Sequence, residues 1–152
     1  MPHTKGHDTG SVSFNEMPSY DAKYEDAELM KKWDKLLSLR EDVKKALENA
    51  RNEKVIGASL EAHVTIYCND ETFAFVDSIK ADLPTVFIAS KVSVVKNVDI
   101  EKSAEKFLGV AIEVEKAEGQ KCERCWMYVD ELSKDEEHET LCPRCAAIVK
   151  EL

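Results

Sequence analysis

The sequence predicts an α+β fold in which a long amphipathic helix packs on a small mixed sheet, followed by a C-terminal zinc ribbon with four cysteine ligands. Three observations support this prediction: helical periodicity over 25–54, β-branched runs near 60–68 and 85–95, and two Cys-x-x-Cys pairs beyond residue 119. We expect a linker or extended arm over 1–19, a helix plus α/β domain over 20–118, and a zinc-ribbon module over 119–152.

Composition narrows the class of protein. The 152 residues are 43% hydrophobic and carry a formal net charge of −9, which argues against binding nucleic acid by overall charge alone. No apolar run approaches the roughly 18 residues of a membrane span, and the first residues lack the apolar core of a secretion signal. Five unevenly placed cysteines favour a reducing compartment, so we expect a cytoplasmic protein without a membrane partner.

The predicted helix over 25–54 has one apolar stripe, with residues recurring every three or four positions. The stripe consists of Leu29, Trp33, Leu36, Leu37, Val43, Leu47 and Ala50. Eight basic residues face five acids between positions 31 and 54. Arg40, Lys44 and Arg51 are therefore candidates for phosphate contacts, although a solvated charged face explains the same pattern.

The segment after the helix reads as strand, helix, strand. Residues 60–68 alternate between apolar and polar side chains, Asn69-Asp70 can cap a short helix over 71–81, and 85–95 is a β-branched run typical of a buried strand. This order indicates a βαβ crossover, and a last strand is expected near 109–117. Cys68 fits the core, and His63, on the polar face of its strand, has no partner that the sequence reveals.

The four cysteines Cys122, Cys125, Cys142 and Cys145 follow the spacing C-x2-C-x16-C-x2-C. Two tight turns joined by a β-hairpin would place four thiolates around one structural Zn²⁺ and leave no position for a reactive water. Two disulfides and an iron–sulfur cluster are the alternatives. His138 lies in a charged loop and reads as solvated, because four cysteines already complete the site.

Residues beside the cysteines suggest how such a site is surrounded. A Zn²⁺ with four thiolates carries two negative charges, which Lys121, Arg124 and Arg144 can offset. Pro143 favours the second turn. The expected apolar cover of the ribbon is Trp126 and Tyr128, with Ile148 and Leu152.

The residues alone indicate a binding or structural module, because no phosphate loop, nucleophile motif or metalloprotease motif occurs. One hypothesis is a nucleic-acid-binding appendage of a larger enzyme. The other is a protein-interaction or docking module whose zinc ribbon only closes the fold.

The stretch from Trp33 to Tyr67 and the cysteine-rich end from Lys121 to Leu152 resemble the C-terminal region of bacterial isoleucyl-tRNA synthetase. The matching pattern includes Leu47 to Arg51 and Ile56 to Ala62, and the likeness extends from about Ser11 to Leu152.

The resemblance implies a tRNA-binding tail of a class I, ATP-dependent isoleucine–tRNA ligase. The catalytic and editing sites would lie upstream, so no catalytic residue is expected here, and ATP would act only in that catalytic domain. The four cysteines match the family's zinc ligands one for one.

The implied partners are isoleucine tRNA and the upstream domains of the same synthetase. Lys121, Arg124 and Arg144 would supply charge, and Trp126 or Tyr128 would stack on a loop base. A DNA-glycosylase type of zinc finger has a similar ribbon, but here Pro2 is followed by His3 rather than by that family's glutamate.

Overall fold

The computed structural model describes residues 10–17, 19–96 and 103–151, and the chain divides into two compact units, 1–32 and 33–152. The described part of the first unit contains two short 3-10 helices, η1 (Val12–Phe14) and η2 (Ala22–Tyr24). No side chain described in residues 10–32 is buried. The domain boundaries expected at 19 and 118 stay predictions.

Helix α1 (Ala27–Asn52) confirms the long predicted helix. Asp26 begins it, because its Oδ1 accepts hydrogen bonds from the backbone N–H groups of Glu28 and Leu29 at 3.0 and 2.9 Å. The side chains that it buries are Leu36, Leu39, Asp42, Val43, Leu47 and Ala50.

The predicted apolar stripe is wrong at three positions. Leu29, Trp33 and Leu37 are 48%, 44% and 48% exposed, whereas Leu39, which the stripe omitted, is fully buried. Leu39 follows Leu36 by three residues and precedes Val43 by four, so these three share one face. Leu37 lies about 100° around the helix from Leu36. Leu29 and Trp33 precede the first buried position of the helix.

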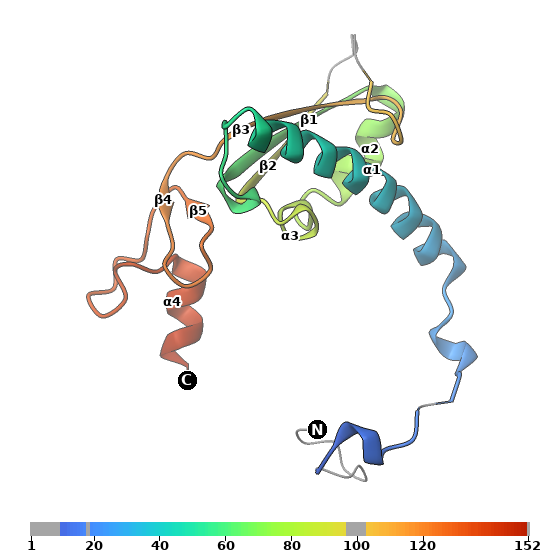
Figure 1. The fold of residues 1–152 in the computed structure, drawn as a ribbon, viewed down its shortest axis with the longest axis horizontal. Helices are drawn as coiled ribbons and strands as arrows, with labels where there is room; N and C mark the ends of the chain where they lie inside the picture. Colours follow the sequence, from blue (N-terminus) through green and yellow to red (C-terminus); the bar gives the residue numbers. More distant parts are fainter. Residues whose placement is uncertain (1–9, 18, 97–102, 152) are drawn as a thin grey trace. The chain divides into compact units, whose positions relative to one another are not determined.

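A three-stranded mixed sheet forms the centre of the second unit (Figure 1). Strand β1 (Ala62–Cys68) lies in the middle, β2 (Lys91–Lys96) pairs with it in parallel, and β3 (Val110–Lys116) pairs with it antiparallel. The buried face of β1 alternates as the sequence predicted, with Cys68 fully buried in the core. Buried side chains from α1, the strands and the crossover helices form one hydrophobic core.

The crossover from β1 to β2 contains two helices instead of one. Helix α2 (Asp70–Ser78) is capped as expected, since Asn69 Oδ1 accepts from the Thr72 N–H at 3.0 Å. The predicted strand over 85–95 is wrong in its first half, where α3 (Leu83–Phe87) forms. Pro84 lies in the first turn of α3, where no backbone donor is needed, and Ile88 ends the helix in the left-handed conformation with φ 56°. Local turn geometry therefore overrides the β-branched composition.

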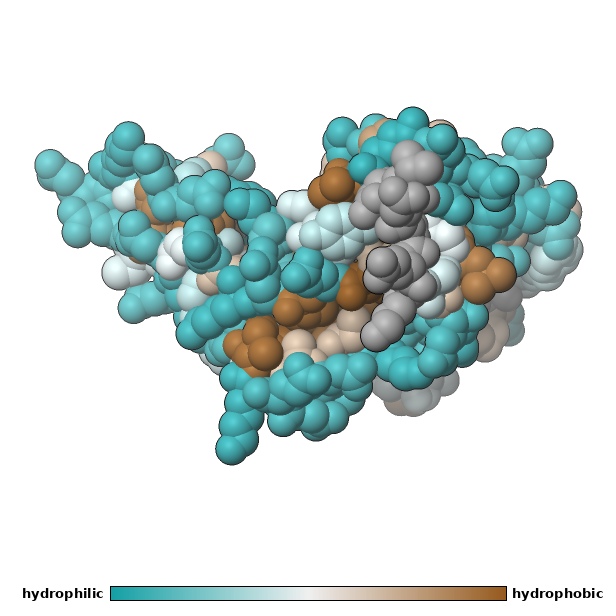
Figure 2. Space-filling view, turned by 90° about the horizontal axis from the view of Figure 1, so that it is seen from above, coloured by the Kyte–Doolittle hydropathy of each residue, from teal (hydrophilic) through white to brown (hydrophobic). Residues whose placement is uncertain are grey.

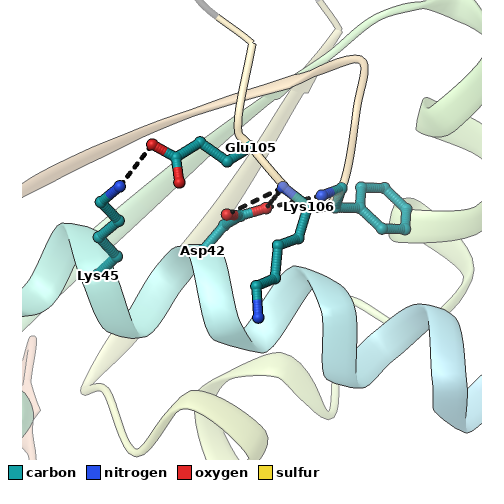
Figure 3. Close-up of polar contacts among 5 residues, drawn as sticks. Asp42, Lys45, Glu105 and Lys106 are labelled. Atoms are coloured by element: carbon teal, nitrogen blue, oxygen red, sulfur yellow. Dashed lines mark hydrogen bonds and ion pairs between the residues drawn. The ribbon is translucent and has the colours of Figure 1, made fainter.

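Asp42 is the buried charged side chain of α1, and it holds the segment that leads into β3 (Figure 3). Its Oδ2 accepts hydrogen bonds from the backbone N–H groups of Lys106 at 2.9 Å and Phe107 at 2.7 Å. Lys45, one turn further along α1, pairs with Glu105 beside it. A carboxylate can thus be buried on the inner face of the helix, because backbone N–H groups satisfy its hydrogen bonds.

His63 has partners on both neighbouring strands, which corrects the expectation of an unpartnered histidine. Its Nε2 lies 2.7 Å from Ser93 Oγ on β2, and its Nδ1 lies 2.9 Å from Glu115 Oε1 on β3. The strand register explains this arrangement. His63 on β1 is aligned with Glu115 on β3 and with Lys91 on β2, and Ser93 lies two residues after Lys91 on the same face of the sheet. This row of polar side chains links all three strands on the face opposite the core.

Hydrophilic side chains predominate on the molecular face shown in Figure 2, with hydrophobic residues visible in separate patches. Among the helices of the described residues, none combines the length and apolar character that crossing a bilayer requires.

Candidate metal centre

The cysteine-rich end folds as a short hairpin followed by a helix. Strand β4 (Gln120–Lys121) pairs antiparallel with β5 (Tyr128–Val129), and helix α4 (Pro143–Lys150) closes the chain. The first cysteine pair, Cys122 and Cys125, lies in the turn between β4 and β5, which we call the first knuckle. In the second knuckle, Cys142 caps α4 and Cys145 lies in the first turn of this helix. The hairpin was expected between the two pairs; it instead encloses the first pair, because Pro143 starts a helix at the second.

The four sulfur atoms meet at one point. Their ligand atoms all lie within 4.8 Å of one another, and Cys125 Sγ is 3.9 Å from Cys142 Sγ. A tetrahedron with Zn–S bonds of about 2.3 Å has S–S edges of about 3.8 Å, so this spacing fits a tetrathiolate zinc site. The same spacing is far too long for a disulfide, whose S–S bond is about 2.05 Å, and all five cysteines are free.

Burial and hydrogen bonding shift the pKa values of Cys122 and Cys142 in opposite directions. Burial opposes the thiolate of Cys122, but nearby backbone N–H groups outweigh it and lower the Cys122 pKa to about 6. One of these donors is the Cys142 N–H, 3.2 Å from Cys122 Sγ. Burial, together with hydrogen bonds that the Cys142 thiol donates to neighbouring sulfurs, raises the pKa of Cys142 to about 12. Cys122 therefore ionises more readily than Cys142, and a bound cation would stabilise both thiolates.

The apolar cover of the site differs from the predicted one. Val129, Leu132 and Leu141 pack against the buried cysteines. Trp126 and Ile148, expected as cover, are 61% and 44% exposed, and Leu152 lies outside the described residues. Trp126 directly follows Cys125, and its backbone is in the left-handed region with φ 64°.

The predicted cations beside the cysteines lie at the surface. Lys121 Nζ is 5.3 Å from the centre of the Trp126 ring, a cation–π distance. Arg124 and Arg144 are exposed, and a hydrogen bond from Arg144 to the Cys145 sulfur raises the Arg144 pKa. Tyr128 is half-buried on β5. The sequence thus located a group of cations and one exposed aromatic ring around the first knuckle.

The three candidates on α1 are engaged within the protein. Arg40 Nε donates to the Val86 carbonyl at 2.9 Å, which joins α1 to the segment of α3. Lys44 pairs with Glu41 at 3.0 Å, and Arg51 pairs with Glu48. Each of the three side chains therefore has a partner outside the cysteine ribbon.

The loop between β5 and α4 is held by its own contacts. Lys150 at the end of α4 pairs with Asp135, and this pair lowers the pKa of the Asp135 carboxyl. The His138 N–H donates to the Asp135 carbonyl at 2.9 Å. Among the described residues, the group of side chains placed to bind a metal ion consists of the four cysteines and does not include His138.

Sequence reasoning missed Ser90, which directly precedes β2. Its hydroxyl reaches the ribbon through the Tyr128 N–H at 2.7 Å. A lone serine inside a β-branched run has no pattern that would have identified it, since its partners are 30 and 38 residues away.

Comparisons with known proteins agree with this geometry. Residues 119–148 match the family described as "Zinc finger found in FPG and IleRS". An isoleucine–tRNA ligase of Desulforamulus reducens is 48% identical over 145 residues, which cover 93% of this chain and 15% of that protein. The chain is homologous to part of isoleucine–tRNA ligase.

Further relatives carry the same name. An isoleucine–tRNA ligase of Bacillus cereus strain B4264 is 45% identical over 152 residues, covering 99% of this chain and 16% of its own length. That of Geobacillus thermodenitrificans is 48% identical over 143 residues, covering 93% and 16%. The chain thus spans about a sixth of the length of these ligases. The zinc-finger match and the four gathered cysteines together support one structural zinc ion as the cofactor.

Proposed function

We propose that this chain is the tRNA-binding end of an isoleucine–tRNA ligase, and that Cys122, Cys125, Cys142 and Cys145 hold its structural zinc. The activation of isoleucine and its transfer to tRNA would belong to the rest of such an enzyme, where ATP binds. The zinc has a folding role here, because four protein sulfurs fill its tetrahedral coordination.

The observation that carries the proposal is the exposed ring of Trp126 at the first knuckle. An aromatic side chain that is 61% exposed beside Lys121 and Arg124 offers a surface for an unstacked base, with cations for the adjacent phosphates. Zinc would fix the turn that presents this ring, since Cys125 directly precedes it. Tyr128 is half-buried and is the weaker candidate for stacking.

Charge supports local recognition over a strong phosphate clamp. From Gly119 onward the chain has five Lys and Arg residues against eight acids. The candidates on α1, Arg40, Lys44 and Arg51, already have partners and would add little. We therefore assign the first contact with tRNA to Lys121, Arg124 and Trp126, with Arg144 close to the second knuckle.

The acidic ribbon also favours a second candidate function, a docking module for the upstream domains of the same ligase. A fluorescence titration of labelled isoleucine tRNA decides between the two, with Arg124→Ala/Arg144→Ala as the test variant. We expect the double variant to bind at least about tenfold more weakly while keeping its zinc. Lys134→Ala, which removes an exposed ribbon cation paired with Glu131, is the matched control. Unchanged tRNA affinity in the double variant would favour docking.

A further inference from the structure

We propose that Ser90 is a positioning residue: its hydroxyl clamps the zinc ribbon to the sheet domain and so fixes the direction in which the first knuckle faces tRNA. The clamp itself stands on the geometry of the chain. Its consequence for tRNA rests on the proposed function.

The Ser90 hydroxyl bridges two parts of the fold that are distant in sequence. Its Oγ donates to the Leu60 carbonyl at 2.5 Å and accepts from the Tyr128 N–H at 2.7 Å. Its backbone N–H donates to the Ala62 carbonyl at 3.1 Å, which fixes Ser90 at the start of the sheet. One half-buried hydroxyl thus uses its donor on the sheet domain and an acceptor position on the ribbon.

The contact on the ribbon side is close to the proposed tRNA surface. Tyr128 is aligned with Lys121 across the β4–β5 hairpin. Met127, between Tyr128 and Trp126, accepts a hydrogen bond from the Cys122 N–H at 3.0 Å. A shift of Tyr128 would therefore move Trp126, two residues earlier in the chain, and Cys122, which is hydrogen-bonded to the intervening Met127.

Other contacts in the described chain leave the orientation of the ribbon weakly determined. Lys91 and Asp130 form an ion pair at 3.8 Å, but their side chains are 55% and 87% exposed, so solvent screens it. The connecting chain is anchored where the Ala117 N–H donates to the Glu61 carbonyl at 2.7 Å, and it turns at Gly119 with φ 108°. A short connection restrains distance, whereas the Ser90 bond adds the second point that restrains rotation.

The test compares Ser90→Ala with wild type in the complete zinc-loaded chain, using backbone ¹⁵N relaxation and tRNA titration. In wild type, ribbon and sheet amides should share one rotational correlation time. In Ser90→Ala the ribbon amides should tumble faster than the sheet amides, with one zinc still bound. The dissociation constant for isoleucine tRNA should rise about three- to tenfold, as expected for the loss of one hydrogen bond that orients the site.

Two further variants separate the clamp from a general loss of stability. Ser90→Thr keeps the hydroxyl and should restore both readouts. Ser93→Ala removes a serine hydroxyl from the adjacent strand, where it contacts His63 and not the ribbon, and should change neither.

The proposal is overturned if the ribbon and sheet of Ser90→Ala still tumble together as in wild type. If that variant does not fold, hydrogen exchange at the Tyr128 amide of wild type decides: slow exchange supports the clamp, and exchange at the rate of a free amide overturns it. If wild type binds no tRNA, the proposed function fails, and the relaxation data still decide the clamp.

Discussion

Asp42→Asn tests whether a buried carboxylate organises the sheet domain. Asp42 is 7% exposed, and its carboxylate accepts two backbone hydrogen bonds, at 2.9 and 2.7 Å. Both N–H groups donate to Oδ2, and the Lys106 N–H is also 3.2 Å from Oδ1. Asparagine has almost the same shape, but its amide oxygen at the Oδ2 position is uncharged, and its NH₂ group at the Oδ1 position faces the Lys106 N–H. Hydrogen bonds to charged groups contribute about 1.5–3 kcal/mol each, and an unsatisfied buried donor costs about 1–3 kcal/mol. We expect a loss of about 2–4 kcal/mol in the free energy of unfolding.

Urea unfolding of the zinc-saturated protein, followed by circular dichroism, measures this loss. With a slope of about 2 kcal/mol/M, the midpoint should fall by about 1–2 M. The neighbouring Glu41→Gln is the matched control, because Glu41 is exposed and pairs with Lys44 on the surface, and it should leave the urea midpoint close to that of wild type. An Asp42→Asn midpoint equal to that of Glu41→Gln would refute the reasoning.

Three further outcomes are expected. The Cys142 thiol, with a pKa of about 12, must lose its proton to bind metal, so zinc affinity should rise about tenfold or more per pH unit above pH 6. Below pH 6 the Cys122 thiol, with a pKa of about 6, must also lose a proton, so zinc affinity should depend on pH more steeply there. Chelator competition at pH 5.5, 6.5 and 7.5 checks this, and a flat profile would contradict it. Gly119→Ala should destabilise the ribbon by about 1–3 kcal/mol, since φ is 108° and an added Cβ would lie 2.3 Å from the Val129 carbonyl oxygen. Faster zinc release to a chelator is the readout, with Gly57→Ala, which meets only the end of a glutamate side chain, as control; equal release rates would refute it. If three cations neutralise one phosphate each, the logarithm of tRNA affinity should fall with the logarithm of salt concentration with a slope of about −2, and a slope near −5 would require a larger basic surface.

The features predicted correctly from the sequence are those that depend on local periodicity or spacing. The helix over α1, the alternation of β1 and the cap at Asn69 each follow from residues within one element. The four cysteines were identified because metal ligands require defined spacing on tight turns. Local patterns therefore established the elements and the candidate site.

The features that the sequence missed depend on contacts between distant residues or on competing local signals. The β-branched residues around Val86 suggested a strand, but Pro84 starts a helix there. The sequence offers Trp126 both as apolar cover and as a stacking surface, and only the structure, in which its side chain is 61% exposed, decides against the cover. Ser90 and Asp42 act through partners at least 30 residues away, and no periodic pattern records such pairs.

The central claim is that one zinc ion on four cysteines shapes a surface that binds isoleucine tRNA. The most direct measurement titrates labelled isoleucine tRNA, with valine tRNA as control, into zinc-loaded wild type and Cys142→Ser side by side. We predict that wild type prefers isoleucine tRNA, and that Cys142→Ser lacks zinc and binds it at least about tenfold more weakly while α1 and β1–β3 stay folded. Equal binding by the two proteins, with zinc absent from the variant, would contradict the claim.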